Sequence, residues 1–136
     1  MVKVIMGLKG SGKTKQLIDL VTQALEHGHG DVVCLEKGPV LTYDIPYQAR
    51  LIQTSDYNFG SFEFFKGFIS GLHAGNYDIM DVFIDSLYKM VDSHTDEEVD
   101  DFLTWLEAFG EKENINFTLT ISADINSATE KMKKYF

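Results

Sequence analysis

Residues 7–14, with the sequence GLKGSGKT, constrain the fold more than any other part of this 136-residue chain. They match the spacing G-x-x-x-x-G-K-[ST] in full. A short β-branched run, residues 2–6, comes before them, and apolar residues at helical spacing follow from Thr14 onward. A strand that enters a glycine-rich turn and continues into an amphipathic helix predicts the first unit of an α/β fold.

Each fixed position of this segment has a physical task in binding an anion. Gly7 is expected to end the strand in a turn with positive φ, and Gly10 and Gly12 let the backbone approach phosphate closely. The backbone amides then lie at the N-terminus of a helix, which favours negative charge. Lys13 would reach the β- and γ-phosphates of a nucleotide, and the hydroxyl of Thr14 would bind Mg²⁺. The residues expected to bind phosphate are Gly7, Lys9, Gly10, Ser11, Gly12, Lys13 and Thr14.

The rest of the chain continues the alternation of strands and helices. Apolar patterns predict strands at residues 31–36, 49–53, 82–85 and 115–121, and a phenylalanine-rich helix at residues 62–72. The apolar residues of that helix cover most of its circumference, so it is expected to be deeply buried or covered by a partner. Residues 39–58 are otherwise expected to form a loop. The pattern predicts one domain, residues 1–136, with a three-layer α-β-α architecture around a mainly parallel sheet of four or five strands.

Helix boundaries can also be predicted from the sequence. Gly28 and Gly30 are expected to end the first helix in left-handed conformations. Residues 95–98, TDEE, have the pattern of a capping box that begins another helix, and residues 127–130, SATE, repeat it. The acidic first turn of the helix after residue 95 suits the positive end of the helix dipole.

Composition narrows the range of partners. Twelve basic residues against 21 acidic ones give a net charge of −9, which disfavours nucleic acids and anionic membrane surfaces. The apolar runs are too short for a membrane helix, and we expect a cytoplasmic protein. Eleven of the basic residues are lysines, so Arg50 is the only arginine available to recognise phosphate. The single cysteine, Cys34, lies within a predicted strand and is expected to be a buried apolar residue.

The chain resembles the P-loop NTPase superfamily at residues 7–14 and at residues 80–85, MDVFID, which look like a Walker B strand. The resemblance implies that Asp85 orients the hydration shell of Mg²⁺, with Asp81 as the alternative carboxylate. Ser86 stands where many ATPases of this superfamily have a catalytic Glu. Residues 42–47 and 74–78 are similar to segments of small bacterial proteins labelled ATP-binding or twitching-motility-like ATPases.

The same resemblance implies candidate catalytic residues. Glu36 ends a predicted strand where RecA-like members carry a catalytic Glu, and the alternative is a surface residue paired with Lys37. Lys13 and Glu36 are therefore the predicted catalytic pair. Ser122 and Asp124 follow the last strand where sensor residues lie in related folds, and either could instead cap a helix.

These residues predict a protein that binds ATP and Mg²⁺. The guanine-reading tetrapeptide [NT]-K-x-D is absent from the sequence, so ATP is favoured over GTP. The leading hypothesis is a Mg²⁺-dependent ATPase whose turnover is weak or depends on a partner, because the phosphate-binding half of the site is complete and the catalytic half is not. The alternative is an interaction or switch module that binds ATP or ADP and contacts a protein partner or a second copy of the chain. A small-molecule or nucleoside kinase is the third hypothesis.

Overall fold

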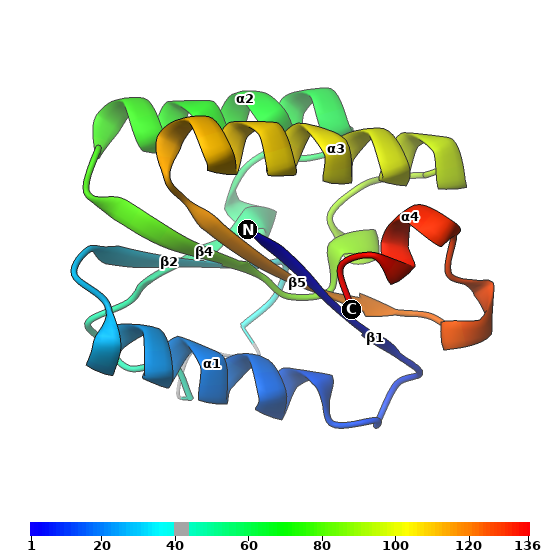
Figure 1. The fold of residues 1–136 in the computed structure, drawn as a ribbon, viewed down its shortest axis with the longest axis horizontal. Helices are drawn as coiled ribbons and strands as arrows, with labels where there is room; N and C mark the ends of the chain where they lie inside the picture. Colours follow the sequence, from blue (N-terminus) through cyan, green and yellow to red (C-terminus); the bar gives the residue numbers. More distant parts are fainter. Residues whose placement is uncertain (40–43) are drawn as a thin grey trace.

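Helices cover both faces of a five-stranded sheet whose strands all run in the same direction (Figure 1). The computed structural model describes residues 1–39 and 44–136. The elements are β1 (Val2–Gly7), α1 (Lys13–His27), β2 (Asp31–Glu36), β3 (Arg50–Gln53), α2 (Phe62–Gly75), β4 (Ile79–Ile84), α3 (Asp96–Glu113), β5 (Asn116–Ser122) and α4 (Glu130–Lys133). The three-layer α/β architecture and the parallel sheet expected from the sequence are therefore confirmed.

The order of the strands in the sheet is β1-β5-β4-β2-β3. Within the sheet β1 pairs with β5, and β5 lies between β1 and β4. The outer edge of β1 is covered by the C-terminal segment, because Val4 N–H donates to the carbonyl oxygen of Tyr135 at 2.8 Å. The strand β3 forms the other edge. All carboxyl ends of the strands lie at one side, from which the chain turns into α1 (Figure 1).

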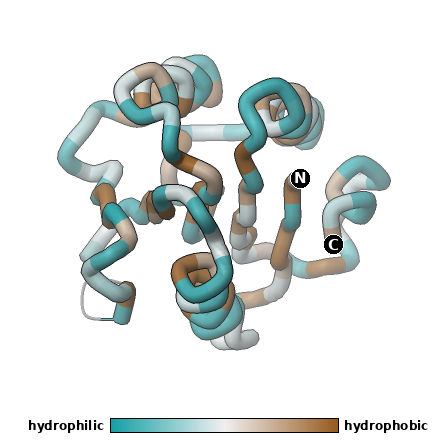
Figure 2. Tube along the Cα trace, turned by 60° about the vertical axis from the view of Figure 1, so that its left-hand side comes forward, coloured by the Kyte–Doolittle hydropathy of each residue, from teal (hydrophilic) through white to brown (hydrophobic). Residues whose placement is uncertain are grey.

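Two apolar layers hold the sheet between the helices. Figure 2 shows that the hydrophobic residues concentrate along the strands, while the helices alternate between hydrophobic and hydrophilic positions. On one face α1 packs Leu17 and Val21 against strand residues that include Cys34. On the other face α2 and α3 bury large residues, among them Phe65 and Phe102, against a more extensive core. The strand residues alternate between these two layers, which fixes the face on which every strand side chain lies.

The helix boundaries follow the sequence in some places and depart from it in others. Thr95 and Glu98 form the capping box as expected. The second predicted box is wrong, because the cap of α4 is Thr129, whose hydroxyl accepts from Met132 N–H at 3.1 Å. The left-handed stops at Gly28 and Gly30 are wrong as well. Close contacts require glycine there, since an added Cβ would lie 2.5 Å from the Ala24 carbonyl oxygen at Gly28 and 2.3 Å from a side chain at Gly30.

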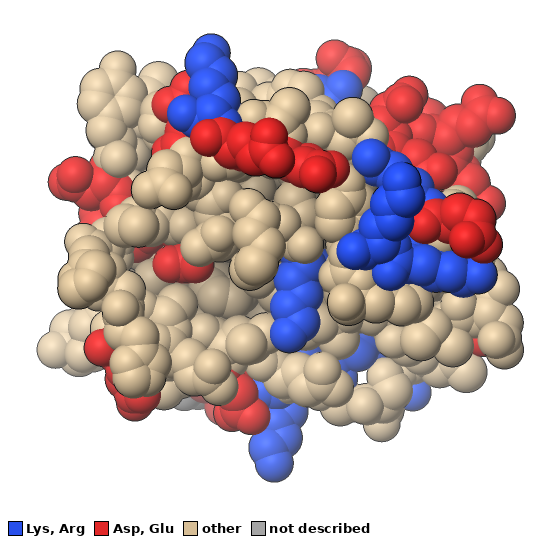
Figure 3. Space-filling view, viewed as in Figure 1, with Lys and Arg blue, Asp and Glu red and all other residues tan. Residues whose placement is uncertain are grey.

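The remaining segments lie close to their predicted positions. The predicted strand at residues 49–53 is β3, Arg50–Gln53. Thr42 and Tyr43, which belong to the predicted loop and to one resembling segment, lie outside the described residues. No helix in the described ranges is both long enough and apolar enough to cross a bilayer. On the face viewed in Figure 3, acidic side chains gather around the start of α3, with basic side chains near α4 beside them.

Candidate functional site

The glycine-rich loop between β1 and α1 is shaped by two residues with positive φ. Gly10 has φ 85° and Gly12 has φ 88°, and an added Cβ at either would meet no atom within 4 Å. Backbone conformation rather than crowding therefore requires glycine at these two positions. Gly7 was expected to have positive φ and does not. Its Cβ would instead lie 2.6 Å from Ser11 Oγ, so glycine lets the loop fold back onto the end of β1.

The N-terminus of α1 differs from those of the other α-helices in the described residues. The helices α2, α3 and α4 each receive a side-chain cap, from Ser61, Thr95 and Thr129 respectively. In α1 the cap position is Gly12, which has no side chain to offer, and the first turn carries no acidic residue. Its amides and its dipole are left to attract an anion. The residues expected to bind phosphate thus surround an uncapped, positively polarised helix end.

Lys13 folds back over this loop. Its ammonium donates to the Leu8 carbonyl oxygen at 2.9 Å and to Ser11 Oγ at 3.3 Å. The side chain is only 7% exposed. A buried ammonium held by neutral oxygens is an unfavourable arrangement unless an anion joins it. Thr14, the next residue, is half-buried in the first turn of α1, and Lys9 is exposed on the loop.

A row of polar side chains crosses the sheet beside this helix end. Ile84 is in register with Leu119 on β5 and with Leu35 on β2, so the next residue of each strand forms the row Thr120, Asp85 and Glu36. By the alternation of the strands, all three side chains lie on the face covered by α1. The three residues lie at or near the carboxyl ends of three neighbouring strands, which is where open α/β sheets bind ligands.

Asp85 is held in place by hydrogen bonds. Thr120 Oγ1 donates to Asp85 Oδ1 at 2.7 Å and accepts from the backbone N–H of Ser86, also at 2.7 Å. The N–H of Asp85 donates to the Leu35 carbonyl oxygen at 2.9 Å. Ser86 has φ 60°, a left-handed conformation that non-glycine residues adopt rarely. Asp85 is therefore held to β5 through its carboxylate and to β2 through its backbone N–H.

The buried charged side chains of the described residues gather at this one end of the sheet. They are Lys13, Glu36 and Asp85, which are 7%, 2% and 7% exposed. Lys, Glu and Asp are almost never this deeply buried unless they have a specific partner. Asp85 and Glu36 belong to adjacent strands, whose backbones lie about 5 Å apart, and two neighbouring carboxylates favour a cation between or beside them. The site therefore combines a place for an anion with a place for a cation.

The residues available for a divalent cation are few. Among the described residues, no group of three or more His, Cys, Asp or Glu side chains is arranged to hold a metal ion. Mg²⁺ is commonly held by one or two carboxylates together with phosphate oxygens of a bound substrate. Asp85 and the hydroxyl of Thr14 suit a Mg²⁺ site that substrate phosphates complete. They are too few to hold the ion by protein ligands alone.

Cys34 lies in the same region but does not have the properties of a nucleophile. It is fully buried between β2 and α1. Burial, followed by the neighbouring carboxylates of Glu36 and Asp85, raises the pKa of the thiol to about 12. The thiol stays protonated at neutral pH, so the structure agrees with the interpretation of Cys34 as a small apolar residue.

Several candidates from the sequence lie away from this site. Asp81 stands four residues before Asp85, about 13 Å nearer the amino end of the sheet. There it accepts from Asn116 Nδ2 at 3.4 Å, and burial raises its pKa. Asp81 therefore lies too far from Asp85 to act beside it at this end of the sheet. Arg50 is exposed at the start of β3, the edge strand farthest from β1, so it cannot serve as an arginine finger within the chain.

The two polar residues after β5 have different roles. Asp124 Oδ1 accepts from Asn126 N–H at 2.9 Å, so Asp124 caps a short 3₁₀ turn. Ser122 is exposed and pairs with Gly7 at the end of β1. Sequence reasoning missed Thr120, which is fully buried and orients Asp85. The available signal was the alternation of β5, which places polar residues on the face covered by α1, and Thr120 is the buried one nearest the carboxyl end of the strand.

Comparisons with known proteins identified no relative of the chain. No known protein family matches the chain, and a search of curated proteins found no significant match.

Proposed function

We propose that the chain is a Mg²⁺-dependent nucleotide-binding protein of the P-loop NTPase type that prefers ATP. One observation carries the proposal: Lys13, Glu36 and Asp85, the buried charged side chains of the described residues, meet the uncapped N-terminus of α1 at one end of the sheet. The ammonium of Lys13 is buried against two neutral oxygens, which is unfavourable without an anion. A metal-bound polyphosphate supplies both the anion and the cation that this arrangement favours.

Each group has a defined task in the proposed complex. The amides of the loop and the first turn of α1 would bind phosphate oxygens, and Lys13 would exchange its contact with Leu8 for a phosphate. Thr14 and Asp85 would bind the Mg²⁺ hydration shell or the ion itself, with Thr120 holding Asp85 in orientation. The bound Mg²⁺ would neutralise charge on the terminal phosphates.

Weak or partner-dependent hydrolysis is the proposed activity. Glu36 is next to Asp85 in the row and is the candidate general base that orients water. The developing charge on the leaving phosphates needs stabilisation as well, and Arg50 lies at the far edge of the sheet. Fast turnover would need a cation from another chain.

Binding can be tested by isothermal titration calorimetry with Mg·ATP, Mg·ADP and Mg·GTP. Lys13→Ala is expected to lose most of the ATP affinity, because it removes the buried ammonium. Lys15→Ala is the matched control, since Lys15 is exposed in the same helical turn and carries the same charge. Equal affinities for the two variants, or no heat with any nucleotide at about millimolar concentration, would contradict the proposal.

Hydrolysis needs a separate test. Glu36→Gln should retain ATP binding and lose phosphate release, because it removes the carboxylate and keeps its shape. If the wild-type protein binds ATP but releases phosphate no faster than Lys13→Ala, the ATPase assignment fails and the binding assignment stands.

A second candidate, a nucleotide-dependent interaction module, is favoured by the exposure of α2. Phe64 is 44% exposed on this helix, although Phe62 and Phe65 are buried. A module of this kind would bind ATP without turnover and change its affinity for a partner between the ATP and ADP states. The phosphate-release assay above separates the two candidates.

A further inference from the structure

A groove runs between α2 and the edge strand β3, on the face of the sheet opposite to α1. Its volume is about 930 Å³. This is within the usual range for sites that bind small molecules. Val33 and Ile52 form part of its floor and belong to the core under α2 and α3. The groove is therefore separate from the loop and from the row of polar side chains, which lie on the other face.

One face of α2 forms a long wall of the groove. Its residues follow helical spacing and alternate between large and absent side chains: Phe64, Gly67, Phe68, Gly71, Leu72 and Gly75. An added Cβ at any of the three glycines would meet no atom within 4 Å. The packing of the chain does not need glycine there, in contrast to Gly110 of α3, where a Cβ would lie 2.6 Å from a carbonyl oxygen. The space over these glycines remains open.

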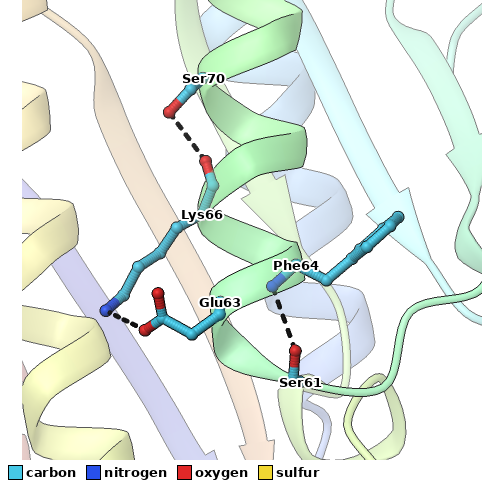
Figure 4. Close-up of polar contacts among 5 residues, drawn as sticks. All are labelled: Ser61, Glu63, Phe64, Lys66 and Ser70. Carbon is cyan, nitrogen blue, oxygen red and sulfur yellow. Dashed lines mark hydrogen bonds and ion pairs between the residues drawn. The ribbon is translucent and has the colours of Figure 1, made fainter.

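The aromatic part of the wall is ordered by ring contacts. Phe68 packs against Tyr57 and Phe59, with ring centroids 5.4 and 4.8 Å apart. In Figure 4, Phe64 projects from α2 on the side opposite to the ion pair of Glu63 and Lys66. The charged side of the helix therefore faces away from the groove. The lining of the groove stays apolar toward the carboxyl ends of the strands.

Arg50, the only arginine of the chain, lines this apolar groove together with Gln48. Among the described residues the guanidinium has no ion pair or hydrogen bond. The carboxylate of Asp31, at the amino end of the groove, accepts from Asn76 Nδ2 at 2.8 Å instead. A planar guanidinium beside a carboxamide offers several parallel N–H donors, which suits a carboxylate in particular.

We propose that this groove binds a small molecule with an apolar chain and a single carboxylate. The carboxylate pairs with Arg50 and Gln48, and the chain lies over the glycines of α2. Arg50 and Gln48 lie at the amino end of β3, so the carboxylate is held at that end of the groove and the apolar chain extends toward Phe64 and Tyr57. The occupant is defined by charge complementarity at Arg50 and by the apolar lining beyond it.

The first test is a titration with decanoate, followed by ¹H–¹⁵N NMR. The amides of Gly67, Gly71 and Gly75 report directly on the wall of the groove. Decanoate is expected to shift them saturably, and decyltrimethylammonium, with a chain of the same length and the opposite charge, is expected to bind about tenfold more weakly. Arg50→Gln should weaken decanoate binding by a similar factor. Lys89→Gln, which removes the same charge from an exposed site outside the groove, should have no effect.

A second variant fills the groove without disturbing the fold. Gly71→Leu places a side chain in open space and improves helix propensity, so it should fold and lose decanoate binding. Ala74→Leu adds the same side chain at an exposed position of α2 outside the groove and should keep binding. Lys13→Ala should also keep it, since the groove is independent of the phosphate loop. Equal binding of the two amphiphiles, or a wild-type dimer in light scattering that Gly71→Leu converts to a monomer, would overturn the proposal.

Discussion

Thr120 links the fold to the candidate site, and its replacement tests the geometry most directly. Thr120→Val keeps the shape of the side chain and removes the hydroxyl that serves both Asp85 and Ser86. Two buried groups lose their partner, a charged carboxylate oxygen and a backbone N–H. At about 1–3 kcal/mol for each such group, the free energy of unfolding should fall by about 2–6 kcal/mol.

Urea denaturation measures this change. With a slope of about 2 kcal/mol per M, in the middle of the range for small domains, the midpoint should fall by about 1–3 M. Thr118→Val is the matched control, because Thr118 is also buried, lies on the same strand and face, and has no hydrogen bond to Asp85 in the described structure. It should cost less than about 1 kcal/mol. Mg·ATP affinity should fall in Thr120→Val and stay unchanged in Thr118→Val.

A double-mutant cycle with Asp85→Asn isolates the pair. If Thr120 acts through Asp85, the combined variant should be more stable than the sum of the single changes predicts, by about 1 kcal/mol. Equal losses from Thr120→Val and Thr118→Val, with additive behaviour in the cycle, would refute the role given to Thr120.

Three further predictions concern other parts of the molecule. The pKa of Cys34 is raised from 9.0 to about 12 in the folded protein, so the unfolded chain loses its thiol proton first as the pH rises. The free energy of unfolding should therefore decline between pH 9.0 and pH 12. Urea titrations at several pH values should show that Cys34→Ala lacks this part of the decline. Thr95→Ala removes the capping box of α3 and should destabilise the protein by about 1–2 kcal/mol in thermal or urea unfolding. Gly71→Ala should stabilise α2 by about 0.5–1 kcal/mol, whereas Gly110→Ala should destabilise the protein, because its Cβ would meet the carbonyl oxygen of Ile115; a midpoint shift of the same sign for both would contradict the contacts described.

Local signals in the sequence predicted the elements well because each depends on residues close together in the chain. The spacing of Gly10, Gly12 and Lys13 places a turn before a helix, and the capping box at Thr95 places the start of α3. These features need no knowledge of the rest of the fold. The same reasoning placed β3, although it covers only four residues.

Features that depend on tertiary contacts could not be predicted from the sequence. The register that aligns Glu36 with Asp85 and Thr120 follows from the order of the strands, which no local pattern specifies. The glycines show the same limit. The sequence predicted positive φ at Gly7 and Gly28, and neither has it. Glycine is needed at both positions because a Cβ would lie too close to atoms that approach it only in the folded chain.

The position of β5 has a consequence for the way the molecule assembles. β1 carries the glycine-rich loop, yet its partner in the sheet is a strand far along the chain, with Val2 opposite Phe117. Pairings between such distant residues form slowly. During synthesis, β1 must therefore remain without its partner strand until β5 has emerged, although α1 can already pack against β2 and β4. The anion-binding and cation-binding parts of the site would then come together in a single late step, when β5 enters between them.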